Sequence, residues 1–195
     1  GSVEFGSGGA TIKLATINAG NGITINGDVS AQSAIFNADY DANGTGTFTI
    51  ASGYDITSTD NQSISITAND IDIYSLATIS SGTGSTTIAV SDGGTIGLGG
   101  TSGNMTITAG ELGRITAGTL NIGDSSTGNI TVDGISAANS NNATTVSLTT
   151  ASGSSVSFSN NDSTFNALTS NGGSTSFGSG LTIATDTGKL SIDSA

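Results

Sequence analysis

Two short segments of the chain repeat in step, and this repeat constrains the fold more than any other feature of the sequence. Gly94–Gly100 (GTIGLGG) returns 24 residues later as Gly118–Asp124 (GTLNIGD). Gly103–Gly110 (GNMTITAG) returns 25 residues after its start as Gly128–Gly134 (GNITVDG). Self-similarity at an interval of this length is typical of architectures in which each unit stacks on the next. The repeat therefore predicts a solenoid.

Pairs of apolar residues two positions apart extend the repeat over most of the chain. Both members of such a pair point to one side of a strand. The pairs form three series, and the steps along the first series are 23 to 26 residues. The first series is Ile23/Ile25, Phe48/Ile50, Ile71/Ile73, Ile96/Leu98, Leu120/Ile122 and Val146/Leu148. The second is Tyr54/Ile56, Ile79, Met105/Ile107, Ile130/Val132, Val156/Phe158 and Leu181/Ile183; the third is Ile64/Ile66, Ile88/Val90, Leu112/Ile115, Ile135, Phe165/Leu168 and Leu190/Ile192.

Three short strands in each interval of about 25 residues predict an all-β fold, a single-stranded parallel β-helix (β-solenoid) with three-sided coils. Seven to eight such coils fit in the chain. Antiparallel hairpins are the competing interpretation, because Asn-Gly steps such as Asn26-Gly27 are also hairpin signals. Hairpins do not require a constant step across three series, whereas stacked parallel strands do. We therefore expect one β-solenoid domain over residues 1–195, either alone or as one segment of a longer array. Residues 31–47 lack clear alternation and are expected to form a loop or bulge.

Composition indicates that this chain is not a disordered linker, and it excludes some classes of binding partner. The 30 glycines suggest low complexity, but the absence of proline and the regular β-branched pairs favour ordered strands. Fifteen acidic residues against three basic ones give a net charge of −12, which repels phosphate backbones and anionic lipids. We expect no nucleic-acid partner and, without an apolar run of about 20 residues, no membrane insertion.

The residue types also leave little room for catalysis. The chain has neither histidine nor cysteine, so imidazole bases and thiol nucleophiles are excluded. Paired carboxylates could hydrolyse glycosides, and Asp70 with Asp72, which should share one strand face, or Asp39 with Asp41 are the candidates. Tryptophan platforms for sugar rings are absent, and cationic groups are scarce. We expect no enzymatic activity and no catalytic residue; a polysaccharide-active β-helix enzyme is an alternative.

One local motif indicates a metal ion. Asp39-Tyr40-Asp41-Ala42-Asn43-Gly44 matches the first half of a calcium-binding EF-hand loop, in which oxygens at alternate positions converge on the ion. The match ends there, because the twelfth position is Ile50 instead of glutamate. The sequence thus offers Asp39, Asp41 and Asn43 as calcium ligands, with a solvated turn rich in Asp and Asn as the other interpretation. Calcium is the one cofactor that the sequence suggests.

The segment LGRITAGTLNIGDSSTGNITVDGI (Leu112–Ile135) resembles the repeats of filamentous-haemagglutinin-like exoproteins, which are large β-helical surface proteins of bacteria. Similar strings of glycine and alternating apolar residues recur more loosely across most of the chain. The resemblance implies a right-handed parallel β-helix, export through an outer-membrane partner, and adhesive or contact-dependent roles. The chain departs from the family's secretion domain, because that domain's Asn-Pro motifs cannot exist in a sequence without proline.

Together these features predict a non-catalytic structural protein, extracellular or on the bacterial cell surface. It would be a β-solenoid subunit of a surface filament, adhesin or matrix fibre such as a biofilm fibre. Neither end shows a capping helix, so both ends of the solenoid should carry unpaired strand edges. Its expected partners are further copies bound head-to-tail, neighbouring repeats, and host or cell-surface glycans or proteins. An excised repeat segment of a giant secreted adhesin is the alternative within the same class.

Overall fold

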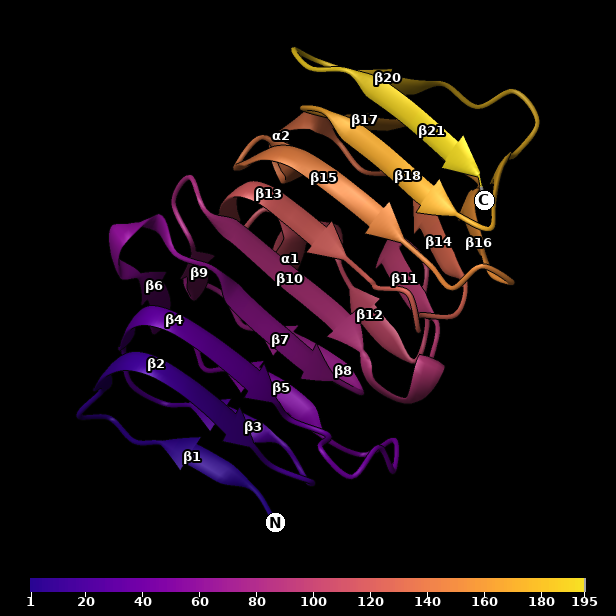
Figure 1. The fold of residues 1–195 in the computed structure, drawn as a ribbon. Coiled ribbons are helices and arrows are strands. Elements are labelled where there is room, and N and C mark those ends of the chain that lie inside the picture. The colour runs from indigo at the N-terminus through magenta and orange to yellow at the C-terminus, as the bar shows by residue number, and fades with distance from the viewer. Residues whose placement is uncertain (195) are drawn as a thin grey trace.

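The computed structural model describes residues 1–194, which form a β-solenoid of about eight turns with coils of about 23 residues (Figure 1). Every strand pairing in this part of the chain is parallel. The all-β class, the parallel β-helix and the three-sided coil expected from the sequence are therefore confirmed. Each coil contributes strands to three faces, here called faces 1, 2 and 3.

Face 1 is made of short strands from successive coils. In spatial order they are β1 (Val3–Phe5), β3 (Ile23–Ile25), β5 (Thr47–Ile50), β8 (Asp70–Ile73), β12 (Met105–Ile107), β11 (Ile96–Gly99), β14 (Ile130–Asp133), β16 (Ser155–Phe158) and β19 (Ser174–Phe177). Strands β8 and β12 lie side by side without a regular backbone ladder, so the hydrogen-bonded sheet is interrupted there.

Face 2 is a continuous sheet that runs the length of the solenoid, and its strands lie across the front of Figure 1. They are β2 (Ala10–Asn18), β4 (Val29–Asn37), β7 (Ile64–Ala68), β10 (Ser85–Val90), β13 (Ile115–Ile122), β15 (Ala143–Thr149), β18 (Leu168–Gly172) and β21 (Leu190–Ser194).

Face 3 is the least regular. The first residues of β2, β4 and β13 lie here, beside β6 (Asp55–Ser58) and β9 (Thr78–Ser80), and two further strands, β17 (Ser163–Phe165) and β20 (Ile183–Thr185), pair with each other. The described helices are single turns at coil corners: α1 (Ala109–Leu112), α2 (Ala137–Ser140), η1 (Thr59–Asn61) and η2 (Ser91–Gly93).

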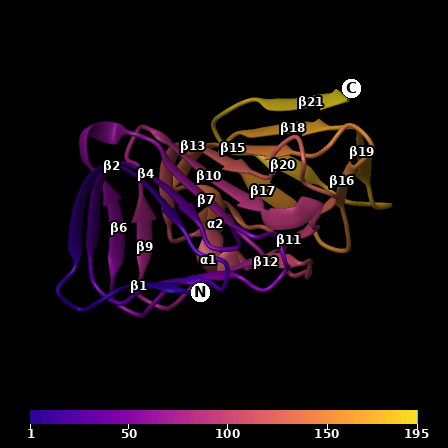
Figure 2. The ribbon, with the colours of Figure 1, turned by 60° about the horizontal axis from the view of Figure 1, so that its bottom comes forward.

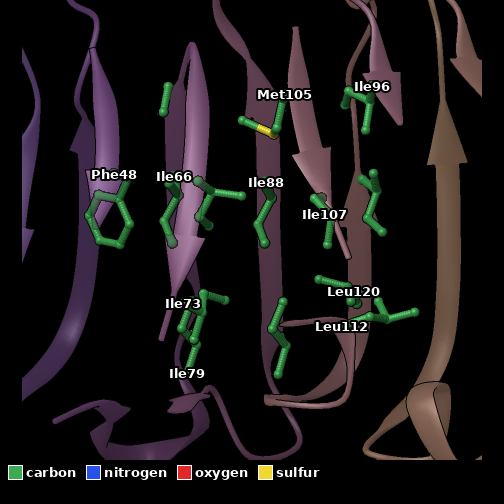
Figure 3. Packing of buried hydrophobic residues seen from close by; sticks show 14 of the residues in the cluster. Phe48, Ile66, Ile73, Ile79, Ile88, Ile96, Met105, Ile107, Leu112 and Leu120 are labelled. Atoms are coloured by element: carbon green, nitrogen blue, oxygen red, sulfur yellow. The ribbon is translucent and has the colours of Figure 1, made fainter. Parts of the chain in front are cut away.

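The core is a narrow column of side chains enclosed by the three faces. In-register pairing places like residues above one another, so that Ile66, Ile88 and Ile122 follow in adjacent strands of face 2. Figure 3 shows these interior side chains, which include Phe48, Ile88 and Leu120, directed into the space between the strands. Glycines permit close approach at the corners: a Cβ on Gly46 would lie 1.9 Å from the carbonyl oxygen of Ala38. The small residues are therefore part of the packing.

The predicted series are wrong about which strands stack after Gly99. In the first series, Ile96/Leu98 lies on face 1, whereas Leu120/Ile122 and Val146/Leu148 lie on face 2. Consequently, Gly94–Gly100 and Gly118–Asp124 do not stack on each other. The reason is an inserted strand: after β11 the chain turns back at once and lays β12 beside β11, with Met105 opposite Ile96 only nine positions earlier. Strands β12 and β14, which carry the second repeated segment, flank β11 on opposite sides.

The loop predicted over residues 31–47 is smaller than expected. Residues up to Asn37 belong to β4, with Ala31, Ala34 and Phe36 in the core, so the segment between strands is 38–46. Strand β4 passes around the corner between faces 3 and 2, and two consecutive side chains, Gln32 and Ser33, point outward there. This change of phase breaks the alternation without ending the strand.

Candidate functional site

The two ends of the solenoid are its first coil, with β1 and β2, and its last coil, with β19, β20 and β21 (Figure 2). At the N-terminal end, β1 pairs with β3 and β2 pairs with β4; on its other edge, neither strand has a partner among residues 1–194. The inward side chains of this first coil, which include Phe5, Ile12 and Ile17, are only half-buried although they pack on the core. Backbone donors and acceptors therefore lie beside accessible apolar surface at this end.

The C-terminal end has the same character. Strands β19, β20 and β21 each pair on one side within the described part of the chain. Phe177, Leu190 and Ile192 each pair with a buried residue of the preceding coil and so continue the inward columns. Their side chains are nevertheless 49%, 37% and 38% exposed. Phe177 stacks on Phe158 of the preceding coil, with ring centroids 5.3 Å apart and ring planes 11° from parallel. The outer face of the Phe177 ring is left accessible.

Such an edge is a template for another strand. A row of unpaired N–H and C=O groups with apolar residues behind it binds a further strand unless charges, bulges or a cap protect it. Charged residues at the two ends are few: Glu4 and Lys13 at the first coil, and Asp186, Lys189 and Asp193 at the last. Within residues 1–194, both end coils therefore offer an unpaired strand edge with few charged side chains.

Hydrogen bonds within the chain engage all three proposed calcium ligands. Asp39 is buried, and its carboxylate accepts hydrogen bonds from the backbone N–H groups of Asn43 (3.2 Å) and Gly44 (3.1 Å). The hydroxyl of Ser91 donates a further hydrogen bond of 2.6 Å to Asp39 Oδ2. Asn43 directs Nδ2, a hydrogen-bond donor, toward Asp41 Oδ2 at 3.0 Å. In this arrangement Asp39 ties the loop to the strand end near η2, and calcium binding stays a prediction.

The paired carboxylates Asp70 and Asp72 lie on the outward side of β8, as the sequence predicts, in a shallow cleft with Tyr74, Glu111 and Arg114. Three of these five side chains replace the missing backbone ladder between β8 and β12. Asp70 Oδ1 accepts from the N–H of Thr106 (2.8 Å). Glu111 Oε1 accepts from the N–H of Ile73 (3.0 Å), and Arg114 Nη1 donates to the carbonyl of Ile73 (2.9 Å).

Glu111 also holds helix α1. Its second oxygen, Oε2, accepts from the backbone N–H of Thr108 (2.9 Å), while the Thr108 hydroxyl oxygen accepts from the Glu111 N–H (3.2 Å). This reciprocal arrangement is a capping box, and the spacing Thr-x-x-Glu is its sequence signal. That signal could have identified Glu111 before the structure was known, but its link to Ile73, 38 residues away, could not be read from the sequence.

The pKa values of Asp72, in the cleft, and of Asp133, a buried aspartate outside it, are shifted in opposite directions. Burial, together with the charges of Asp70 and Glu111, raises the pKa of Asp72. By contrast, hydrogen bonds from the side chains of Asn160 and Asn161 lower the pKa of Asp133. A carboxyl with a raised pKa beside another carboxylate fits the requirements of a general acid, but Asp70 and Glu111 are already bonded to backbone groups. Residues 1–194 contain no cluster of three or more acidic side chains placed to hold a metal ion.

None of the helices in residues 1–194 is long and apolar enough to cross a membrane. Comparison of the chain with models of protein families, with curated proteins and with solved structures finds no match.

Proposed function

We propose that the chain is a non-catalytic structural protein of the bacterial surface or extracellular matrix, a rigid β-solenoid rod that associates through its open ends. One observation carries this proposal: the inward columns run to both ends of the described solenoid, where their last members, such as Phe177 and Ile192, remain exposed. A surface of this kind is stabilised when a further coil covers it.

The extracellular location rests on the resemblance of Leu112–Ile135 to bacterial surface repeats, and on the chemistry of the chain. The resemblance is to proteins that serve as long rods outside the cell. Low charge density, parallel ladders and a packed interior column favour a stiff element that resists unfolding. The lateral segment 38–46 and the outward Ser, Thr and Asn side chains are where glycans or surface proteins would bind.

Two arrangements satisfy the same observation. In a filament, the coil covering each end comes from another copy of the chain. In a giant adhesin, it comes from flanking coils of the same polypeptide, and the described residues are one segment of the array. In both cases the rod is a spacer, and its ends meet further β-solenoid coils.

A polysaccharide-active enzyme is the alternative from another class. The cleft of Asp70, Asp72 and Tyr74 would be the active site of such an enzyme. However, Asp70, Glu111 and Arg114 of this cleft already form hydrogen bonds that join β8 to the segment of β12 and α1, a junction here called the β8–β12 splice. Release of oligosaccharides from acidic or neutral polysaccharides, abolished by Asp72→Asn, would replace the structural proposal with an enzymatic one.

Sedimentation and electron microscopy of the purified chain test the structural proposal. We expect concentration-dependent association into unbranched fibres one rod in width, at about 0.15 M salt so that repulsion between chains of net charge −12 is screened. A chain that stays monomeric at high concentration, with and without calcium, contradicts self-association. A longer natural polypeptide with coils on both sides would then support the adhesin segment.

A further inference from the structure

We propose that the C-terminal coil of one copy stacks in register on the N-terminal coil of a second copy in the same orientation, with β21 pairing to β2 and β19 to β1. This register rests on the proposed function and specifies its interface. It places Ile192 over Ile17 and Phe177 over Phe5 of the next copy.

The register of face 2 can be followed strand by strand. Starting at Ile17, the inward column passes through every strand of the face to the last coil. Its members are Ile17, Phe36, Ile66, Ile88, Ile122, Leu148, Ser170 and Ile192, each opposite the next. Because no strand slips along this column, continuing the stack by one coil brings the position of Ile17 over that of Ile192. Leu190 takes the equivalent position over Ala15.

Face 1 leads to the same relation. Phe5 is the second inward residue of β1 and pairs through Ile25 and Ile50 to Ile73. On the other side of the β8–β12 splice, Leu98 pairs through Val132 and Phe158 to Phe177. Both columns hold the second inward position of their strands, so Phe177 is the counterpart of Phe5 at the opposite end.

The aromatic rings fit this contact. Phe177 already stacks face to face on Phe158 within the chain, which shows that the coil spacing at this position accepts two rings. Its free face is therefore spaced to receive Phe5 of the next copy. Phe5 meets Phe36 edge-on at 6.1 Å, and its side chain is only half-buried in the first coil. Offset or tilted rings at such distances are favourable.

The outward columns meet without conflict of charge. Glu4 of the second copy lies over Ser176, because both belong to the middle position of their strands on face 1. Asp193 lies over Asn18, since both occupy the position after the second inward residue of face 2. No carboxylate of these positions faces another carboxylate. A one-residue slip would turn the apolar set of each strand outward, which fixes the register.

The proposed contact also determines the symmetry of the assembly. All strands run in the same sense, so a two-fold axis at an end would oppose them antiparallel and would bring like ends together. Parallel stacking joins the C-terminal end of one copy to the N-terminal end of the next. This heterologous contact does not close on itself and produces a polar filament.

Engineered cysteines test the register directly, because the chain has no cysteine of its own. Thr16 and Ser191 are outward residues of one unbroken column of face 2. In the double variant Thr16→Cys/Ser191→Cys, oxidation of the assembled protein should give a ladder of disulfide-linked multimers. Directly opposed residues of neighbouring strands lie within disulfide reach. Glu4→Cys/Ser176→Cys should give the same ladder from face 1.

The matched control is Asn18→Cys/Ser191→Cys, which displaces one partner by two positions, beyond disulfide reach. Multimer ladders from this control and none from Thr16→Cys/Ser191→Cys, in a protein that still forms fibres, would overturn the register and leave the proposed function standing. No ladder from any pair and no association of the unmodified chain would overturn both.

A second variant separates docking from folding. Ile192→Lys places a charge in the proposed interface and should abolish fibres, while Ser191→Lys, on the outward side of the same strand, should preserve them. Circular dichroism of both variants as monomers reports whether the fold is intact. Fibres that persist in Ile192→Lys contradict the proposed contact, whatever their register.

Discussion

The middle and the ends of the solenoid contain the same kinds of residue in the same columns, yet their environments are opposite. Phe158 is 2% exposed, whereas Phe177, the next residue of its column, is 49% exposed. Leu168 is fully buried, whereas Leu190 above it is 37% exposed. An inward side chain of this solenoid is therefore shielded from solvent mainly by the coil stacked on it, and less by the coil to which it belongs. The difference teaches that a coil's stability comes from its neighbours, and that apolar surface stays exposed in the coils that have only one neighbour among residues 1–194.

The largest loss of stability is expected from a substitution in the middle of the solenoid. Ile88→Ala should destabilise the protein by about 2–5 kcal/mol, because it opens a cavity between coils that are fixed by backbone ladders on both sides. Ile192→Ala, in the same column at the end, should cost less than about 1 kcal/mol in the monomer because the site is open to solvent. Urea unfolding of the two variants at low protein concentration makes the comparison. Equal losses would contradict the account of neighbour-dependent stability.

The next effect concerns the splice between β8 and β12. Glu111→Ala removes the acceptor of the Ile73 N–H and half of the capping box, and should destabilise the protein by about 1–3 kcal/mol. Asp72→Asn, in the same cleft, should cost nothing or stabilise slightly at pH 7. Its pKa is raised in the folded protein, so its ionised form is disfavoured there. Thermal unfolding at neutral pH compares them, and a larger loss in Asp72→Asn would contradict the structural role of Glu111.

A smaller effect should appear in acid. Hydrogen bonds from Asn160 and Asn161 hold the pKa of Asp133 below its ordinary value of 3.8. A carboxyl with a lowered folded-state pKa stabilises the protein fully above its unfolded pKa, and this contribution is lost as the pH falls through the folded pKa. Stability should therefore decline below about pH 4, and the decline should be shallower in Asp133→Asn. Melting temperatures between pH 2 and pH 6 measure this slope. Identical slopes would show that Asp133 does not contribute.

Calcium gives the smallest expected effect. If the loop 38–46 binds the ion, the melting temperature should rise with calcium concentration. Asp41→Ala should lose that response, because Asp41 is an exposed proposed ligand and its removal keeps the hydrogen bonds that Asp39 accepts from the backbone of Asn43 and Gly44. Magnesium at the same concentration controls for charge screening. An unchanged melting temperature in calcium would leave the loop as a hydrogen-bonded turn held by Asp39 and Ser91.

Most of the fold could be predicted because its signal is local. Apolar residues two apart mark inward strand positions, and their recurrence at about 25 residues requires stacked coils. The assignment of strands to faces could not be predicted, since all three faces use the same pattern of glycine and alternating apolar residues. The insertion of β12, nine positions after β11, therefore shifted the series without any change in composition. Likewise, the corner at Gln32 and Ser33 looked like a loop because a continuous strand changes phase there.

The sequence predicts where the candidate surfaces lie, but not which residues from distant segments contribute to them. The sequence predicts unpaired strand edges at both ends of the described residues, and the alternation within β8 places Asp70 and Asp72 on one side of the strand. The partners of that cleft come from the inserted segment, so Glu111 and Arg114 were not expected near Ile73. The direction of the Asn43 amide, which decides how the loop's oxygens are arranged, depends on hydrogen bonds that no local pattern encodes.

A helical reconstruction of the filament by electron cryomicroscopy tests the central claim most directly. In-register stacking predicts a polar fibre with a strand spacing of about 4.8 Å and a subunit repeat of about 38 Å along the eight strands of face 2, with β21 of each copy paired to β2 of the next. Fibres with two-fold contacts between like ends would contradict the account, as would a repeat that leaves the end coils uncovered.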